Sequence, residues 1–309
     1  MTARFLRPLA AVALLAAALP GVAAAATGGE KEVPRHNSFG GSCPKCELSG
    51  RRLAGAQFIA ADFSGAALVG SDLREARFMA SNFAGADLSR ADLTDSELMG
   101  ASFRGANLSH ARLRSTSAKG VVFNGANLTS ADLSDAEMVA ASFQDAIMLR
   151  VVMRSAELHG VNMRNADARE ADFKDAALNG AMLSGHFDKA SFRSAELNSA
   201  VLLGGTFDGA DFKDAELHHT VIAGVDLSRA RNLTQDQVDE ACGDSRTRLP
   251  NGLALHACGS MLRVIIQQAG SGAWSHAIPA PPAPPAPPAP PVPPTPPTPT
   301  RYLVTMPAY

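Results

Sequence analysis

Aromatic residues and excess charge are both scarce in this sequence. Only 6% of the 309 residues are Phe, Trp or Tyr, including one Trp and two Tyr. An enzyme of this length ordinarily builds its core and its substrate pocket from more bulky and aromatic side chains. The formal net charge is −2 at pH 7, which argues against a basic nucleic-acid-binding protein and against a strongly acidic one. We therefore expect a non-enzymatic chain that needs no metal and no cofactor.

The first residues have the features of a secretory signal. Arg4 and Arg7 precede an apolar run from Leu9 to Leu19, and four alanines at 23–26 offer small-residue cleavage sites. The run is too short to span a bilayer comfortably, although an uncleaved anchor is the alternative. We expect residues 1–26 to be removed on export, which leaves a periplasmic or secreted protein with no membrane span.

The other end of the chain is dominated by proline. Residues 278–309 contain repeated Pro-Ala and Pro-Thr units, and proline cannot join the interior of a helix or sheet because it lacks an amide donor. We expect a Pro-rich tail outside the folded part, in a stiff polyproline II conformation. A spacer is the favoured interpretation and a ligand for a proline-binding module the alternative. Residues 261–277 are expected to be a linker.

The middle of the chain repeats every five residues. From Leu48 to Leu183 every fifth residue is a large apolar one, with only Ala118 and Ala168 as exceptions. Two residues before each of these central positions lies Ala or another small residue. The phase slips by one residue at 184–186, and the series then continues from Phe187 to Leu227. A five-residue period fits neither an α-helix nor a flat strand, but it fits a coil with four sides of five residues each.

Four such sides predict a second period of 20 residues, and the sequence contains it. Identical side chains 20 residues apart would stack on successive coils, and the backbones would bond from coil to coil. One such column is Phe63, Phe83, Phe103, Phe123 and Phe143, and another is Leu53, Leu73, Leu93, Leu113 and Leu133.

The individual units resemble a known family. The segments 86–90 (ADLSR), 106–110 (ANLSH) and 131–135 (ADLSD) are similar to the A-(D/N)-L-x-x motif of the pentapeptide-repeat family. The resemblance covers about 185 residues and implies an all-β, right-handed quadrilateral β-helix over residues 48–232. About nine coils would make a solenoid roughly 45 Å long. The missing residue near Gly185 predicts a corner defect or a slight kink.

The four cysteines lie where the ends of such a solenoid need caps. Residues 27–47 are expected to form an N-terminal linker and cap that includes Cys43 and Cys46. Residues 233–260 are expected to form a C-terminal cap with a short helix starting at the N-cap Thr234. A disulfide between Cys242 and Cys258 is predicted for an exported protein, and this end also resembles the closing segment of exported family members.

The spacing Cys43-x-x-Cys46 leaves two structural interpretations open, a local disulfide or a pair of capping thiols. A thioredoxin-like redox motif would need a strand-to-helix context, which is missing. A four-cysteine zinc site would need both pairs together, and the solenoid would hold them at opposite ends.

Charged residues follow the columns of the predicted coil. Basic residues after one set of central positions (Arg74, Arg114, Arg154, Lys174, Arg193, Lys213) neighbour aspartates before them, which predicts a solvated ladder of ion pairs. The next side is predominantly acidic and also carries an apolar group near its N-terminal end. We predict it to be the partner-binding surface. Its residues are Glu97, Glu137, Glu157, Glu196, Glu216, Ile59, Met79 and Met99.

Together these features favour an exported, non-enzymatic scaffold of the bacterial cell envelope that binds a protein partner and no nucleic acid. Unpaired backbone at the ends leaves end-to-end stacking of two copies open. The family resemblance suggests an alternative, a DNA mimic that inhibits a type II topoisomerase. Residues 48–232 hold 19 Lys and Arg against 23 Asp and Glu, which is weak negative charge for a DNA mimic, and export would separate the protein from that target.

Overall fold

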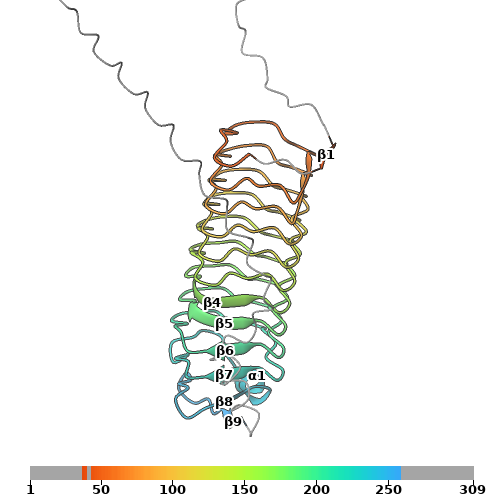
Figure 1. The fold of residues 1–309 in the computed structure, drawn as a ribbon. Helices are drawn as coiled ribbons and strands as arrows, with labels where there is room; N and C mark the ends of the chain where they lie inside the picture. The colour runs from red at the N-terminus through yellow and green to blue at the C-terminus, as the bar shows by residue number, and fades with distance from the viewer. Residues whose placement is uncertain (1–36, 40–42, 259–309) are drawn as a thin grey trace, which may run out of the picture. The chain divides into compact units, whose positions relative to one another are not determined.

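The computed structural model describes residues 37–39 and 43–258 (Figure 1). The predicted signal peptide, the linker at 261–277 and the Pro-rich tail lie outside these residues. The described chain is a β-solenoid of about nine turns, which confirms the predicted fold class. In the described part of the chain, no helix has the length and hydrophobicity that a membrane span requires.

Each side of the coil follows the same local plan, illustrated by residues 61–66. Ala61 and Phe63 point inward and are buried, while Asp62 between them is partly exposed and pairs with Asn82 of the next coil. A β-turn then makes the corner, closed by the Ala66 amide donating to the Phe63 carbonyl over 3.0 Å. The third turn residue, Gly65, has a φ of +63°, which lies in the left-handed region that glycine occupies without strain.

Four sides complete a coil, and we name them by their first central residues. Face A starts at Leu48, face B at Leu53, face C at Phe58 and face D at Phe63, and each recurs every 20 residues up to the slip. Backbone hydrogen bonds join successive coils in parallel register, as when the Leu68 amide donates to the Asp87 carbonyl over 2.7 Å. Backbone hydrogen bonds between neighbouring coils, together with one bond across most corners, therefore satisfy the polar groups of the backbone.

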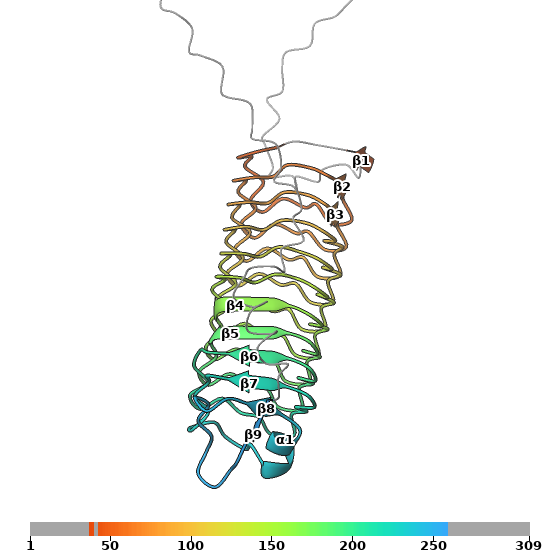
Figure 2. The same ribbon diagram turned by 60° about the horizontal axis from the view of Figure 1, so that its bottom comes forward.

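Two faces have enough continuous pairing to form named strands (Figure 2). All neighbouring strands are parallel. On face C the sheet consists of β1 (Asn37–Phe39), β2 (Gln57–Ile59) and β3 (Arg77–Met79). On face D it consists of β4 (Asn162–Asp167), β5 (Met182–His186), β6 (Val201–Leu203), β7 (Val221–Ala223), β8 (Cys242–Gly243) and β9 (His256–Ala257).

The interior is filled by stacked side chains of the same kind. Phe83 lies 4.8 Å from Phe103 between ring centroids, with the ring planes only 2° apart. Phe103 and Phe123 stack in the same way at 5.1 Å. These rings are fully buried, whereas Leu48 and Phe58 of the first coil are only partly buried. The column predicted from the 20-residue period is therefore confirmed, and the N-terminal coil is its less covered end.

The missing residue produces the predicted corner defect. Strand β5 continues through the place of the corner to His186, and its pairing with β4 skips Asn165, which forms a bulge. Gly185 does not have a positive φ, and a Cβ atom there would lie 2.2 Å from the Ala166 carbonyl oxygen. Only glycine fits this close approach of two backbones.

Both ends carry additional structure. Helix α1 (Gln235–Asp239) begins at the N-cap Thr234 as predicted, with a capping box to Gln237, and its Val238 is fully buried. Strand β1 was not foreseen: Ser38 pairs with Phe58 and extends the five-residue phase upstream of Cys43. The coil-to-coil pairing also continues beyond residue 232, since Asp226 pairs with Arg248.

Candidate interaction surface

The outer faces of the solenoid are the only extensive surface on which described side chains can meet another molecule. A depression lies beside α1, lined in part by Lys213, Asn232 and Gln237. The Gln237 side-chain amide is already engaged there, because it donates to the carbonyls of Phe212 and Ala215 at 2.8 Å each. No group of three or more metal-ligating side chains is brought together among residues 43–258.

Face B carries the ion-pair ladder predicted from the sequence. Arg74 binds Asp72 through both carboxylate oxygens at 2.8 Å, and this bond lowers the pKa of Asp72. Further along, Arg154 reaches Asp172 of the next coil at 2.5 Å, and Arg193 reaches Asp211 at 3.3 Å. Because its cations are matched by neighbouring carboxylates, face B offers little uncompensated charge to a partner.

The five glutamates predicted for the partner surface form one column on face C, before the central positions. Within it Glu137 neighbours Glu157, and Glu196 neighbours Glu216 on adjacent coils, while Ser117 and Ala177 interrupt the column.

Their side chains differ in how they are neutralised. Glu97 pairs with Arg77 at 3.0 Å and Glu137 with Lys119 at 2.5 Å. Glu196 and Glu216 accept hydrogen bonds from the neutral amides of Asn179 and Asn198 at 2.8 and 3.0 Å. The Glu157 carboxylate has no partner among the described residues. The C-terminal half of face C therefore retains its negative charge.

The apolar group lies on the same face, after the central positions of the first three coils. Ile59 is 43% exposed and Met99 is 40% exposed. Met79 lies between them and is partly buried, so it is less accessible than the sequence suggested. The structure also exposes Ile147 on face A, at 46%, which the repeat pattern did not indicate.

A second acidic column, at the corner between faces B and C, was missed. From residue 95 onward its members alternate between aspartate and serine, and all occupy the left-handed region as the third residue of a turn. Aspartate tolerates that conformation better than most non-glycine residues, so the turn position itself was the available signal. We call this column the B–C edge: Glu75, Asp95, Ser115, Asp135, Ser155, Asp175, Ser194 and Asp214.

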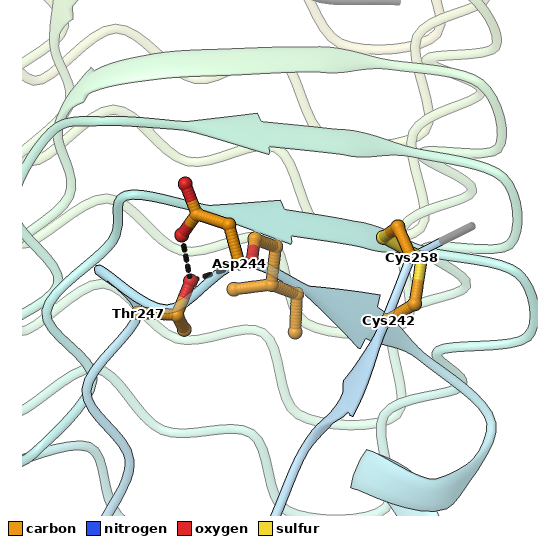
Figure 3. The surroundings of a disulfide bond; sticks show 5 residues. Cys242, Asp244, Thr247 and Cys258 are labelled. Carbon is orange, nitrogen blue, oxygen red and sulfur yellow. Dashed lines mark hydrogen bonds between the residues drawn. A yellow bond between two sulfur atoms is a disulfide. The ribbon is translucent and has the colours of Figure 1, made fainter. Parts of the chain in front are cut away.

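The cysteines are paired within each end of the solenoid. Cys43 is bonded to Cys46 with 5.4 Å between their Cα atoms, and Cys242 is bonded to Cys258 with 4.8 Å between theirs (Figure 3). The second bond joins β8 to the residue that directly follows β9. The two pairs lie at opposite ends of the solenoid, so one chain does not bring the four cysteines together (Figure 1).

Asp244 organises the C-terminal cap beside the second disulfide (Figure 3). Its Oδ1 accepts from the Gly224 amide at 2.8 Å, from the Arg246 amide at 3.2 Å and from the Thr247 hydroxyl at 3.0 Å. Desolvation works to raise the pKa of Asp244, but the bonds from Gly224, Arg246 and Thr247 outweigh it and lower the pKa to about 2. The carboxylate thus replaces the carbonyl that a further coil would have offered to Gly224.

Comparisons with known proteins agree with this architecture. The family model described as pentapeptide repeats matches in eight copies, within residues 45–95, 96–185 and 190–229. Among solved structures, the chain is similar to HetL, a pentapeptide repeat protein involved in heterocyst differentiation regulation from Nostoc sp. strain PCC 7120, at 24% identity. That match covers 74% of this chain and 95% of HetL, with a TM-score of 0.30.

A second structure is trypsin-treated QnrB1, a plasmid-mediated fluoroquinolone resistance protein, at 18% identity. It covers 75% of this chain and 96% of QnrB1, with a TM-score of 0.27. A third is a pentapeptide repeat protein from the thylakoid lumen of Arabidopsis thaliana, at 28% identity over 41% of this chain and 70% of that one, with a TM-score of 0.18. No curated protein sequence matches the chain.

Proposed function

Because the chain belongs to the pentapeptide repeat family, we propose that it is an exported, non-enzymatic scaffold of the bacterial cell envelope that binds a protein partner through face C. Proteins of this family are generally structural or interaction proteins, and a solid core leaves binding to the outer surface. The observation that carries the proposal is the uneven distribution of charge and apolar surface among the four faces.

Face C differs from its neighbours in what it leaves unmatched. Face B pairs its basic and acidic residues along the column, whereas Glu157, Glu196 and Glu216 keep their charge. Exposed Ile59 and Met99 lie on the same face. An exposed apolar group and an acidic surface on one face are features of protein-binding surfaces.

The export part of the proposal is supported by the sequence of residues 1–26 and by paired cysteines at both ends. Disulfides persist in oxidising compartments, and they are rare in the reducing cytosol. The cysteines at 43, 46, 242 and 258 are all paired, and none is left free.

The alternative is a DNA mimic directed at a type II topoisomerase. It would require dense negative charge along the whole solenoid. Face C and the B–C edge hold 10 of the 23 acidic residues of 48–232, face D holds only Asp62 and Asp145, and the aspartates of face B are interleaved with Arg and Lys. A supercoiling assay with the mature protein tests this alternative, and inhibition at micromolar concentration would favour it over the scaffold.

The experiment that tests the scaffold combines fractionation with site-specific crosslinking. The full chain is expressed in bacterial cells with a photo-crosslinking amino acid at one outward position of each face, such as Glu157 on face C and Asp188 on face A. We expect the cleaved chain in the envelope or the medium and one discrete adduct from face C. A cytoplasmic, uncleaved chain, or adducts that do not depend on the face, would contradict the proposal.

A further inference from the structure

We propose that face C binds a partner segment in the polyproline II conformation that is apolar at one end and basic along the rest, with a cationic side chain at about every third residue. This inference rests on the proposed function, because it names the chemistry of the partner for the same surface. It is carried by three observations: an exposed apolar end, a length of uncompensated acidic surface, and the spacing of both along the solenoid.

The apolar end lies where the face is a regular parallel sheet. Strands β1, β2 and β3 occupy it, and Ile59 pairs with Met79 across β2 and β3. Ile59 and Met99 are the most exposed apolar side chains of face C, and they lie two coils apart with the less exposed Met79 between them. Contact with an apolar side chain of a partner would remove both of them from water, which favours binding.

The acidic length follows on the same face and at its B–C edge. From residue 95 to residue 219 neither column contains Lys or Arg, and Lys119, which lies outside both columns on face C, pairs with Glu137. Asp95 and Asp214 of the edge have no side-chain partner among the described residues. Asp135 and Asp175 are partly compensated, because each forms an exposed pair with a basic residue of face B, Arg114 or Lys174, at 3.4 Å. Charge complementarity therefore requires a basic partner.

A second copy of this chain does not meet that requirement. In a parallel arrangement the acidic length of one face C would oppose the acidic length of the other. In an antiparallel arrangement the carboxylates would oppose Ile59 and Met99 and lose hydration without a counter-charge. Both arrangements are unfavourable, so the occupant is a different molecule.

The spacing selects a polyproline II segment over a helix or a strand. Coils lie about 4.8 Å apart, so the aspartates of the edge recur at about 9.6 Å, two coils apart. Three residues of polyproline II make one turn and span about 9.3 Å, so every third side chain returns to the same face with a mismatch near 0.3 Å per step. In a β-strand the third side chain would point to the opposite face. A helix returns to the same face after two turns, about 10.8 Å, and its mismatch exceeds 3 Å over the three steps from Asp95 to Asp214. The exposed apolar pair, Ile59 and Met99, has the same two-coil spacing.

The test uses labelled synthetic peptides and the mature protein with its disulfides intact. Every third position of the probe is Leu at one end of the peptide and Lys along the rest, and the positions between are Ser and Thr. The peptide is made in both sequence directions. The control peptide has the same composition with its Lys residues adjacent. Fluorescence anisotropy at low salt is expected to show at least about tenfold tighter binding of one direction of the probe than of the control, and the binding should weaken as salt is added.

Matched variants assign the binding to the surface. The triple variant Asp95→Asn, Asp175→Asn, Asp214→Asn removes three charges from the B–C edge, and asparagine tolerates the left-handed conformation. Its control removes three charges from faces A and D, by Glu47→Gln, Asp145→Asn and Glu170→Gln. We expect about a tenfold loss of affinity in the first and less than twofold in the second. For the apolar end, Ile59→Ser with Met99→Ser should weaken binding, and Ile147→Ser with Leu149→Ser should not.

Equal affinity for the probe and the clustered control, or equal loss in both triple variants, would overturn the inference. Circular dichroism and thermal unfolding of each variant establish that it is folded before binding is measured. A face C crosslink in cells together with no preference for the spaced peptide would overturn the partner chemistry alone. Absence of export or of any face-specific crosslink would overturn the proposed function instead.

Discussion

Replacing Asp244 with asparagine tests whether one carboxylate holds the C-terminal cap together. Asparagine has nearly the same shape as aspartate, so the packing stays intact. The change removes the negative charge and replaces one acceptor oxygen with a donor amide group. In the structure the carboxylate accepts from Gly224, Arg246 and Thr247, and only 16% of its side chain is exposed. The asparagine oxygen could keep the place of Oδ1, but its bonds to Gly224 and Thr247 would no longer be charge-assisted. The amide nitrogen in place of Oδ2 would face the Arg246 guanidinium, which donates to Oδ2 at 2.9 Å.

The magnitude follows from the pKa. Asp244 has a pKa of about 2 in the folded chain, against an ordinary value of 3.8 for aspartate. Each pKa unit corresponds to about 1.4 kcal/mol, so the shift corresponds to about 2 kcal/mol of stability for the ionised side chain. Arg246 is 73% exposed, so its share is reduced by solvent screening, and the Gly224 and Thr247 bonds supply most of the effect.

The pH dependence has a definite sign. A carboxyl whose pKa is lowered on folding stabilises the protein fully above its unfolded pKa, and that contribution is lost as the pH falls through the folded pKa. The contribution of Asp244 should therefore be complete above about pH 5 and should fall below about 1 kcal/mol near pH 2.5.

Urea denaturation at several pH values, with hydrogen exchange at Gly224, measures both quantities. We expect the Asp244→Asn variant to be about 2 kcal/mol less stable than the parent at pH 7, and the two to converge near pH 2. Asp145→Asn, at an exposed corner of face D, serves as the control and should change stability by less than about 0.5 kcal/mol. A pH-independent difference, or none at pH 7, would refute the reasoning.

Four further changes test the core, the corner defect and the C-terminal disulfide, each by urea or thermal unfolding. Gly185→Ala places a Cβ 2.2 Å from a backbone oxygen and should lower the free energy of unfolding by at least about 2 kcal/mol. Gly85→Ala, which has free space around it and φ +65°, is the control and should lower it by about 1 kcal/mol. Equal losses in the two variants would contradict the close approach of backbones at Gly185. Phe103→Ala should cost about 3–5 kcal/mol because its ring is stacked on both sides, and a loss below about 1 would contradict a filled interior. Ser96 has a buried hydroxyl with no partner, so Ser96→Ala should be neutral or stabilising by about 1 kcal/mol, and a clear loss would reveal a missed bond. The double variant Cys242→Ser, Cys258→Ser removes the disulfide between two residues 16 positions apart and should lower the free energy of unfolding by about 3 kcal/mol. Hydrogen exchange should rise first at β8 and β9. A uniform rise along the solenoid would contradict a local cap.

Much of the solenoid was readable from the order of residues. The five-residue phase assigns Phe103 to the interior and Ser102 to the surface, because every coil repeats one turn and one inward pair. The 20-residue period predicts which side chains stack, and the one-residue slip predicts where a corner is lost. The Thr234 capping signal likewise placed α1, since capping depends on residues close together in sequence.

The partnerships on the surface depended on the tertiary structure. Some side chains contact a residue on the next coil that is not directly above or below them, and this depends on how far each coil is offset from the next. These pairs are Lys119 with Glu137, Arg154 with Asp172, and Asn179 with Glu196. The slip also appears as a bulge at Asn165, one coil before the missing residue, because β5 is straight and its neighbour absorbs the difference in length.

Local repetition therefore determined the coil, its columns and its corners in advance, because turn geometry and alternating burial are properties of five consecutive residues. Contact between coils decided which carboxylates of face C stay uncompensated and how far Met79 is covered, because these depend on side-chain reach across about 4.8 Å between chains that are 20 residues apart in sequence.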